Sequence, residues 1–195
     1  MKTLPDAWNW YEATKRNLTR MRRLGSKHWN DPSLETASIW EDDEFRMLEA
    51  TDIVEETTAS LQPIDDLAVV VLFSVFESRV RDHLVEQIEP QADRLTDPIL
   101  KEAADDAVQG VKEGSFYRRV LGPLKKQGRV SDDLVEQVNQ VRDYRNWVAH
   151  GRRNAPTNNV TPEIAYERLS EFLAVLGIAA EPEQIEPEWP GAEQE

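Results

Sequence analysis

Apolar residues recur at helical spacing along most of the chain, and nothing resembles a series of alternating strands. The clearest helix is predicted over Asp65 to Ile88, where a continuous apolar run leads into apolar positions four residues apart. The valines in that run also fit a buried strand, but the length of the segment and the later spacing favour a helix. We place its N-cap at Asp65 and Asp66, after a stop at Pro63, and its end at Pro90.

Further helices are predicted from capping residues and helix breakers. Asp97, Ser131 and Thr161 are typical N-caps, and Gly151 lies where a glycine should follow a helix. Gly25 is an interior weakness of the first helix. The expected ranges are 5–29, 33 or 41 to 60, 98–111, 115–127, 132–150 and 162–176. The fold class is therefore predicted to be all-α, an up-and-down helical bundle with short connections.

The length of 195 residues suits one domain and is too short for two full ones. We assign residues 1–178 to a single all-α domain, with an N-terminal helical extension over 1–60 and a core over 61–178. Residues 179–195 are acidic and rich in proline, a composition typical of disordered tails.

Composition argues against several classes of protein. Without cysteine the chain has no disulfide, thiolate zinc site or cysteine nucleophile, which fits a reducing compartment. The three histidines are too few and too scattered to suggest a metal site. The N-terminus lacks the apolar segment of a secretory signal, and the longest apolar run is about half the length that spans a bilayer. We therefore expect a cytoplasmic protein without membrane contact.

Charge is unevenly distributed along the chain. A formal net charge of −14 disfavours diffuse attraction to nucleic acid. Two basic clusters interrupt this acidity, one from Lys15 to Lys27 and one of arginines around His150. Such a cluster can bind a phosphate backbone at one place on an acidic protein. For Lys15 to Lys27 we favour the simpler interpretation, a solvated surface.

The helix predicted over 132–150 combines an apolar seam with polar residues. Arg145 falls on the seam, which is formed by Leu134, Val138, Val141 and Val148. An arginine there is costly to bury unless it is paired or faces a cavity. Arg142, Asn146 and His150 lie four residues apart on the adjacent face. Arg145 and His150 are about 140° apart around the axis, so their convergence requires the helix to end at His150 or a second copy of the chain.

Glu77 offers a partner for Arg145, because it lies on a mostly apolar face of the helix predicted over 65–88. An ion pair would satisfy both groups and would make the two helices packed neighbours. Two interpretations remain open for this pair. It belongs to a reactive site, or it is a structural ion pair that sets the packing register.

The string from Arg145 to Gly151, RNWVAHG, resembles the R-N-x-x-x-H motif of the HEPN superfamily. The surroundings over roughly 61–177 are similar as well, with a long apolar helix that contains a glutamate and the motif near the end of a later helix. The resemblance implies a helical bundle of the HEPN type that forms a homodimer and cleaves RNA where the two motifs meet. Many members are toxins of toxin–antitoxin or phage-defence systems, and others are catalytically silent.

The resemblance also implies a role for each residue of the motif. RNA carries its own nucleophile, the 2′-hydroxyl, so cleavage to a 2′,3′-cyclic phosphate requires neither a metal nor a cofactor. His150 is the expected general acid or base, Arg145 the phosphate ligand and Asn146 the orienting amide. Glu77 is expected to support Arg145. Contacts with the RNA backbone are expected from Arg142, Arg152 and Arg153.

One position departs from part of the family. HEPN toxins that pair with a nucleotidyltransferase antitoxin often carry a tyrosine two residues after the histidine, where this chain has Arg152. A stand-alone protein, or a different antitoxin or defence partner, is therefore expected. The competing hypothesis is a non-catalytic module that dimerises or binds a partner, in which Arg145 and Glu77 are structural. The presence together of Arg145, Asn146 and His150 favours the ribonuclease, whereas the strong negative charge and the acidic tail favour this second hypothesis, or else regulation.

Overall fold

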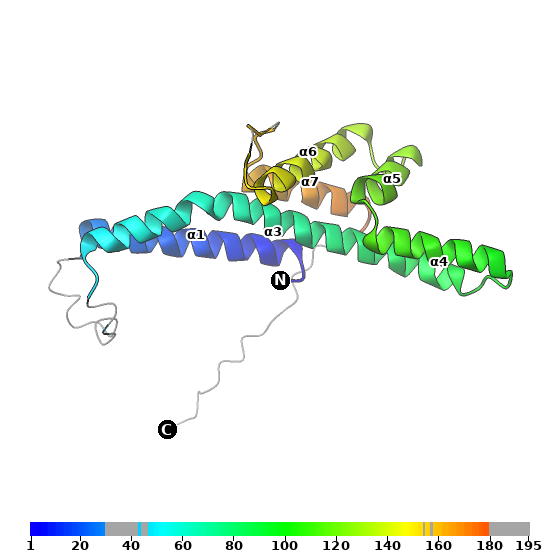
Figure 1. The fold of residues 1–195 in the computed structure, drawn as a ribbon, viewed down its shortest axis with the longest axis horizontal. Helices are drawn as coiled ribbons and strands as arrows, with labels where there is room; N and C mark the ends of the chain where they lie inside the picture. Colours follow the sequence, from blue (N-terminus) through cyan, green and yellow to red (C-terminus); the bar gives the residue numbers. More distant parts are fainter. Residues whose placement is uncertain (30–42, 44–46, 154, 157, 180–195) are drawn as a thin grey trace, which may run out of the picture.

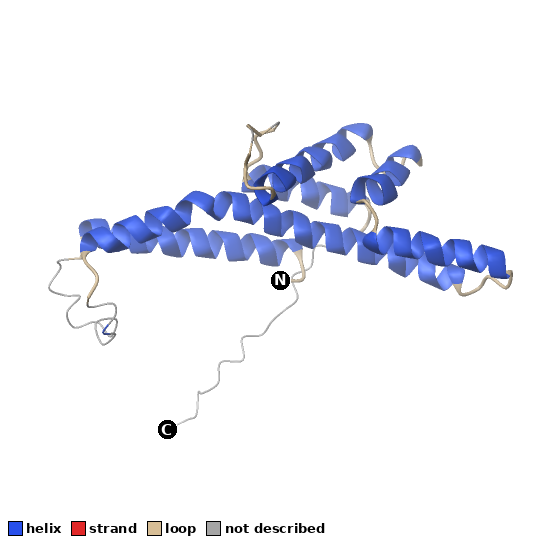
Figure 2. Ribbon diagram, viewed as in Figure 1, coloured by secondary structure: helices blue, strands red, loops and turns tan. Residues whose placement is uncertain are grey.

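The computed structural model describes residues 1–29, 43, 47–153, 155–156 and 158–179. Over these residues it contains helices and connecting turns and no strand (Figure 2), so the all-α prediction is confirmed. The helices are α1 (Leu4–Lys27), α3 (Ala50–Ala92), α4 (Pro98–Glu113), the π-helical turn η3 (Tyr117–Leu121), α5 (Gly122–Lys126), α6 (Asp132–Ala149) and α7 (Pro162–Val175).

A single long helix, α3, forms the axis of the molecule (Figure 1). Its 43 residues extend about 64 Å at 1.5 Å per residue. α1 lies along its first half and α4 along its last part, while α6 and α7 cover its middle (Figure 1). The result is an elongated helical bundle whose ends project as the helix pairs α1–α3 and α3–α4.

The predicted helix boundary at Pro63 is wrong, because α3 passes through Pro63 and also contains Pro90 near its end. A proline inside a helix removes one backbone hydrogen bond and crowds the preceding turn, at a cost of about 3 kcal/mol. Here Ile53, Thr57 and Ile64, on both sides of Pro63, are buried. Packing along α1 therefore holds the two parts of α3 in one helix.

Asp65 and Asp66 are consequently residues of the helix interior and not N-caps as predicted. Asp65 binds two side chains of α1, accepting hydrogen bonds from the Tyr11 hydroxyl (2.8 Å) and the Lys15 ammonium (2.9 Å). Asp66 binds α6 and the turn after it. These two carboxylates connect α3 to the helices on its two sides.

The other predicted helix starts agree with the capping seen in the structure. Asp97, Ser131 and Thr161 each accept a hydrogen bond from a backbone N–H two or three residues further on. Gly151 follows α6 with φ +77, the conformation expected of a glycine after a helix. The Thr3 cap of α1 escapes the sequence analysis. The predicted starts at 33 or 41 and the predicted tail over 180–195 lie outside the described residues.

The core lies where α6 and α7 cover the middle of α3. Phe73 and Phe76 of α3 meet Phe116 and Phe172 nearly edge to face, with ring centroids 5.3 to 5.9 Å apart. Leu4, at the start of α1, is buried in the same cluster. The N-terminal helix therefore contributes to the core. The predicted division into an N-terminal extension over 1–60 and a core over 61–178 stays a prediction.

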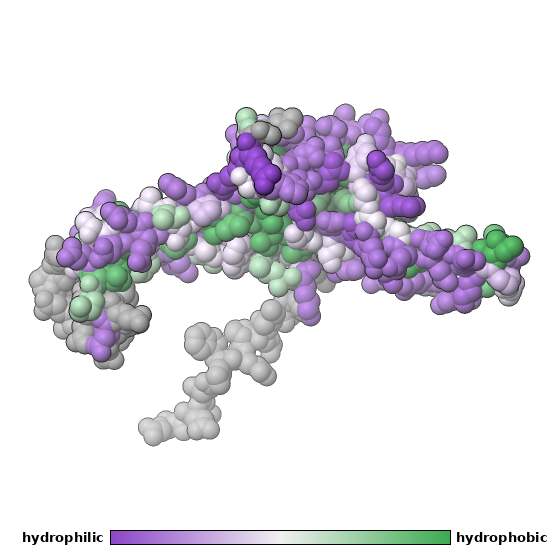
Figure 3. All heavy atoms as spheres, viewed as in Figure 1, coloured by the Kyte–Doolittle hydropathy of each residue, from purple (hydrophilic) through white to green (hydrophobic). Residues whose placement is uncertain are grey.

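α3 is long and apolar enough to cross a membrane, by length and composition alone. Core helices of soluble proteins share this property, and α3 buries Val69, Leu72 and Val80 in the bundle. Most of the visible surface is hydrophilic, with an apolar patch along the middle of α3 near the end of α6 (Figure 3). The expectation of a cytoplasmic protein stays a prediction.

Candidate functional site

The motif predicted from the sequence lies in the last turns of α6, against the middle of α3. α6 buries Val138 and Val141, which belong to the predicted apolar seam. Arg145 continues this seam and is half-buried, with its guanidinium 5.7 Å from the centroid of the Phe73 ring on α3. An aromatic face attracts a cation, so this stacking offsets part of the desolvation of the arginine.

Arg145 lines a polar cavity of about 410 Å³ between α3, α6 and the turn that precedes η3. Three other residues predicted for the site, Glu77, Arg142 and Asn146, line the same cavity. The structure therefore brings together four of the seven predicted residues. The cavity does not include the other three, which are His150, Arg152 and Arg153.

The predicted ion pair between Glu77 and Arg145 is not formed. Glu77 Oε1 instead accepts hydrogen bonds from Nε (3.1 Å) and Nη2 of Arg81, one turn later on α3. Arg81 also donates to the backbone carbonyls of Val111 and Gly114. A pair four residues apart on one helix forms without the help of another element, which explains why Glu77 takes the nearer arginine. α3 and α6 are packed neighbours, as predicted.

Arg145 is left without a carboxylate partner among the described residues. Its Nη1 donates to Oδ1 of Asn146 at 3.0 Å, whereas its Nε is buried and has no partner. Arg142 does have a carboxylate partner, Asp143, to which Nη2 donates at 2.9 Å, and its Nε is likewise buried without a partner. The buried Nε atoms are out of reach of a ligand, but Nη2 of Arg145 and Nη1 of Arg142 also have no partner among the described residues, which suits the two guanidinium groups to bind an anion such as phosphate.

Two further residues that line the cavity escape the sequence analysis. Arg81 lies over the ring of Phe116 at 5.3 Å, and Tyr117 lies under Arg142 at 5.2 Å. The four-residue spacing from Glu77 is the signal that indicates Arg81. Tyr117 comes from η3, and no local pattern in the sequence places it beside α6.

His150 lies outside the cavity. α6 ends at Ala149, and His150 is the exposed residue that caps it. Gly151 and Arg152 follow with φ +77 and +56, and their N–H groups bond to carbonyls of the last turn, which terminates the helix. The helix therefore ends where the sequence predicts, but this ending does not bring the imidazole to Arg145 within one chain.

Arg152 is bound to the protein itself. Its guanidinium pairs with Asp66 of α3 and lies 6.0 Å from the centroid of the Trp147 ring. The Tyr144 hydroxyl donates to the other oxygen of Asp66 at 2.6 Å, and burial together with this hydrogen bond raises the pKa of Tyr144 to about 12. Arg152 is thus less available to RNA than predicted, whereas Arg153 is exposed.

No group of side chains suited to a metal ion is found in the part of the chain that the structure describes. In comparisons with known proteins, no protein-family model, curated protein or solved structure matches the chain. The reaction that the site supports is therefore inferred from its own residues, above all from Arg142 and Arg145, which line the cavity.

Proposed function

We propose that this protein is a metal-independent endoribonuclease of the HEPN type, with a toxin or phage-defence role. One observation carries the proposal: Arg142 and Arg145 line a polar cavity, with unused N–H donors, on the helix that ends at His150. A guanidinium without a carboxylate partner is suited to hold a scissile phosphate and to stabilise the charge that develops on it.

In the proposed reaction the 2′-hydroxyl of RNA attacks the adjacent phosphorus atom. An imidazole removes the 2′ proton, the bond from phosphorus to the 5′ oxygen breaks, and the leaving oxygen takes up a proton. His150 is exposed, and histidine exchanges protons near neutral pH. The products are a 2′,3′-cyclic phosphate and a 5′-hydroxyl. DNA has no 2′-hydroxyl and is not a substrate.

The separation of His150 from the cavity favours a site that two copies of the chain complete. In a two-fold dimer the same surface of each copy is used, so His150 of one copy can approach Arg145 of the other. An apolar surface for this contact lies in the middle of α3, where Leu67 is 47% exposed and Val71 is half-buried. We therefore include a homodimer in the proposal.

Cleavage of a structured RNA in EDTA tests the proposal. The wild type is expected to release fragments with cyclic phosphate ends. Arg145→Ala and His150→Ala, shown by circular dichroism to be folded, are expected to lose activity at least about 100-fold. The matched controls, Arg94→Ala and His83→Ala, change the same residue types at positions that do not line the cavity and are expected to retain activity.

Equal behaviour of the wild type and the two motif variants across several RNAs would overturn the ribonuclease assignment. The non-catalytic module that dimerises or binds a partner would then be the better account of Arg145.

A further inference from the structure

A basic stripe runs along the outer side of α1 and has no role in the site described above. It consists of Arg16, Arg20, Arg23 and Lys27, which follow one another by four, three and four residues. At about 100° per residue they fall within a sector of about 60° and extend about 16 Å along the axis. This sector lies opposite the side of α1 that buries Tyr11 and contacts α3.

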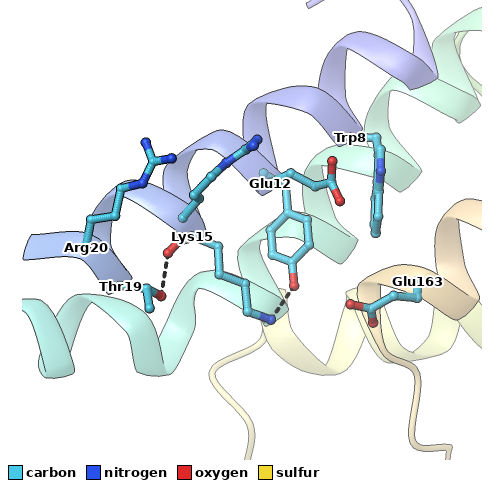
Figure 4. A pocket seen from close by; sticks show the side chains of 8 residues that line it. Trp8, Glu12, Lys15, Thr19, Arg20 and Glu163 are labelled. Atoms are coloured by element: carbon cyan, nitrogen blue, oxygen red, sulfur yellow. Dashed lines mark hydrogen bonds between the residues drawn. The ribbon is translucent and has the colours of Figure 1, made fainter. Parts of the chain in front are cut away.

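All four residues of the stripe lie at the surface, and among the described residues none forms an ion pair or a side-chain hydrogen bond. Lys15 is different, because it donates to the Tyr11 hydroxyl (2.6 Å) and to Asp65 (2.9 Å). Figure 4 shows Lys15 reaching away from α1, while Arg20 lies along its outer side. Like charges three or four residues apart destabilise a helix, so four uncommitted cations in one row point to an anionic partner.

The stripe suits a polyanion better than the surface of a folded protein. Protein interfaces are centred on apolar and aromatic anchors, and none of the exposed large apolar residues of the described chain lies between Arg16 and Lys27. The residues between the first two arginines include Asn17 and Thr19, which are polar. A single nucleic-acid strand instead offers a regular row of phosphates.

The end of the stripe nearer the bundle opens onto a cavity of about 480 Å³ (Figure 4). Arg16, Arg20 and the ring of Trp8 line this cavity together with Glu12 and Glu163. The ring of Trp8 is half-buried and stacks on Tyr166, with centroids 4.9 Å apart, so only the part that borders the cavity is open to a base. The two carboxylates repel phosphate, so the backbone of a bound strand is expected to follow the stripe and not to enter the cavity.

The same end of the stripe is linked to the proposed cleavage site through two neighbouring residues of α3. Lys15, which lines the cavity, is bound to Asp65. The next residue of α3, Asp66, is bound to Arg152, two residues after His150. A strand that leaves His150 can therefore continue along α1.

We propose that the basic stripe of α1 binds the backbone of single-stranded RNA outside the cleavage site. This inference rests on the proposed function and deepens it, because it gives the substrate a second contact that positions it without reading its sequence.

The test measures binding of an oligonucleotide that cannot be cleaved. A fluorescein-labelled, 2′-O-methylated single strand of about 20 nucleotides spans the stripe and the site, and its anisotropy is followed across a salt series. The stripe variant is R16Q/R20Q/R23Q/K27Q. Loss of four phosphate contacts is expected to make the decrease of the logarithm of the binding constant with the logarithm of the salt concentration shallower by about 3. Binding at low salt is expected to weaken at least about tenfold.

A matched control removes the same number of exposed positive charges elsewhere. It is the variant R94Q/K101Q/K126Q/R129Q, whose four residues are exposed and do not line the cavity of the candidate site. Because its net charge equals that of the stripe variant, the long-range field is the same and only the position of the charges differs. The control is expected to bind with nearly the slope of the wild type.

Equal binding by the stripe variant and the control overturns the proposal. So does a stripe variant that binds RNA normally but loses affinity for a peptide with the sequence of residues 181–195, because the stripe would then bind an acidic protein segment. A protein that binds through the stripe but cleaves no RNA contradicts only the proposed function. A protein that cleaves RNA while both variants bind equally contradicts only the stripe.

Discussion

Two neighbouring carboxylates of α3 bind the same kinds of group in different settings. Each accepts a hydrogen bond from a tyrosine hydroxyl and pairs with one cation, Tyr11 and Lys15 for Asp65, and Tyr144 and Arg152 for Asp66. The side chain of Asp65 is 47% exposed and that of Asp66 only 17%. The first cluster joins α3 to α1 alone, whereas the second joins α3 both to α6 and to the turn that follows it.

The difference between the two clusters shows how one arrangement of an aspartate, a tyrosine and a cation serves two purposes. At Asp65 it fixes the packing of α1 on α3. At Asp66 it holds Arg152 in a left-handed conformation, with φ +56, immediately beyond the turn that follows His150. Asp66 is therefore a positioning residue for the proposed site, and Asp65 is not.

The largest expected difference is in stability. Asp66→Ala leaves the buried Tyr144 hydroxyl without its acceptor and removes the pair with Arg152, so we expect a loss of about 2–3 kcal/mol in the free energy of unfolding. Asp65→Ala also removes the acceptor of the Tyr11 hydroxyl, but that hydroxyl still accepts from Lys15, and the ion pair that is lost is more exposed, so the expected cost is about 1 kcal/mol. Urea denaturation of both variants measures the difference. Equal losses would show that the two clusters are equivalent.

A smaller and more specific effect is expected from two glycines. Gly151 and Gly128 both have positive φ, +77 and +65, and a Cβ atom at either position would project into open space. Alanine at either position is therefore expected to cost about 1 kcal/mol through backbone strain alone. Only Gly151→Ala is expected to lower RNA cleavage, because it disturbs the turn beside His150. Activity that falls equally in both variants would attribute the effect to stability.

The effect that is smallest near neutral pH is a loss of stability that appears only at high pH. Burial raises the pKa of Tyr11 and of Tyr144 from 10 to about 12. Below pH 10 the folded and the unfolded chain both keep these hydroxyl protons. Between pH 10 and 12 the unfolded chain releases them while the folded chain retains them, so the free energy of unfolding falls as the pH rises through this window. Tyr11→Phe and Tyr144→Phe should each reduce that fall, measured by urea midpoints. An unchanged pH dependence in both variants would contradict this assignment.

Local signals in the sequence predict much of the fold. Asp97, Ser131 and Thr161 mark helix starts because their side chains bind backbone N–H groups a few residues away. The continuation of α3 through Pro63 depends on contacts with α1, which no local pattern reveals. Gly25 is likewise explained by packing, since a Cβ atom there would lie 3.0 Å from Cγ2 of Ile53 on α3.

The candidate site is predictable to a similar degree. The position of Arg145 on an apolar seam predicts a cavity or a partner, and the structure provides the cavity. The prediction of Arg145 as the partner of Glu77 is wrong, because Arg81 on the same helix is nearer. The role of Asp66 could not be predicted, because two acidic residues after a proline have the pattern of an N-cap. The partners that Asp66 binds in the structure come from distant parts of the chain.

Mixing two inactive variants tests most directly whether Arg145 and His150 act together across two copies of the chain. Arg145→Ala and His150→Ala, each inactive alone, are unfolded together, refolded and assayed for RNA cleavage in EDTA. In a two-fold dimer about half of the refolded dimers contain one chain of each variant. If Arg145 and His150 of one site come from different chains, each mixed dimer has one intact site out of two. The activity should therefore return to about a quarter of the wild-type value. Mixed dimers that form but remain inactive would contradict the account.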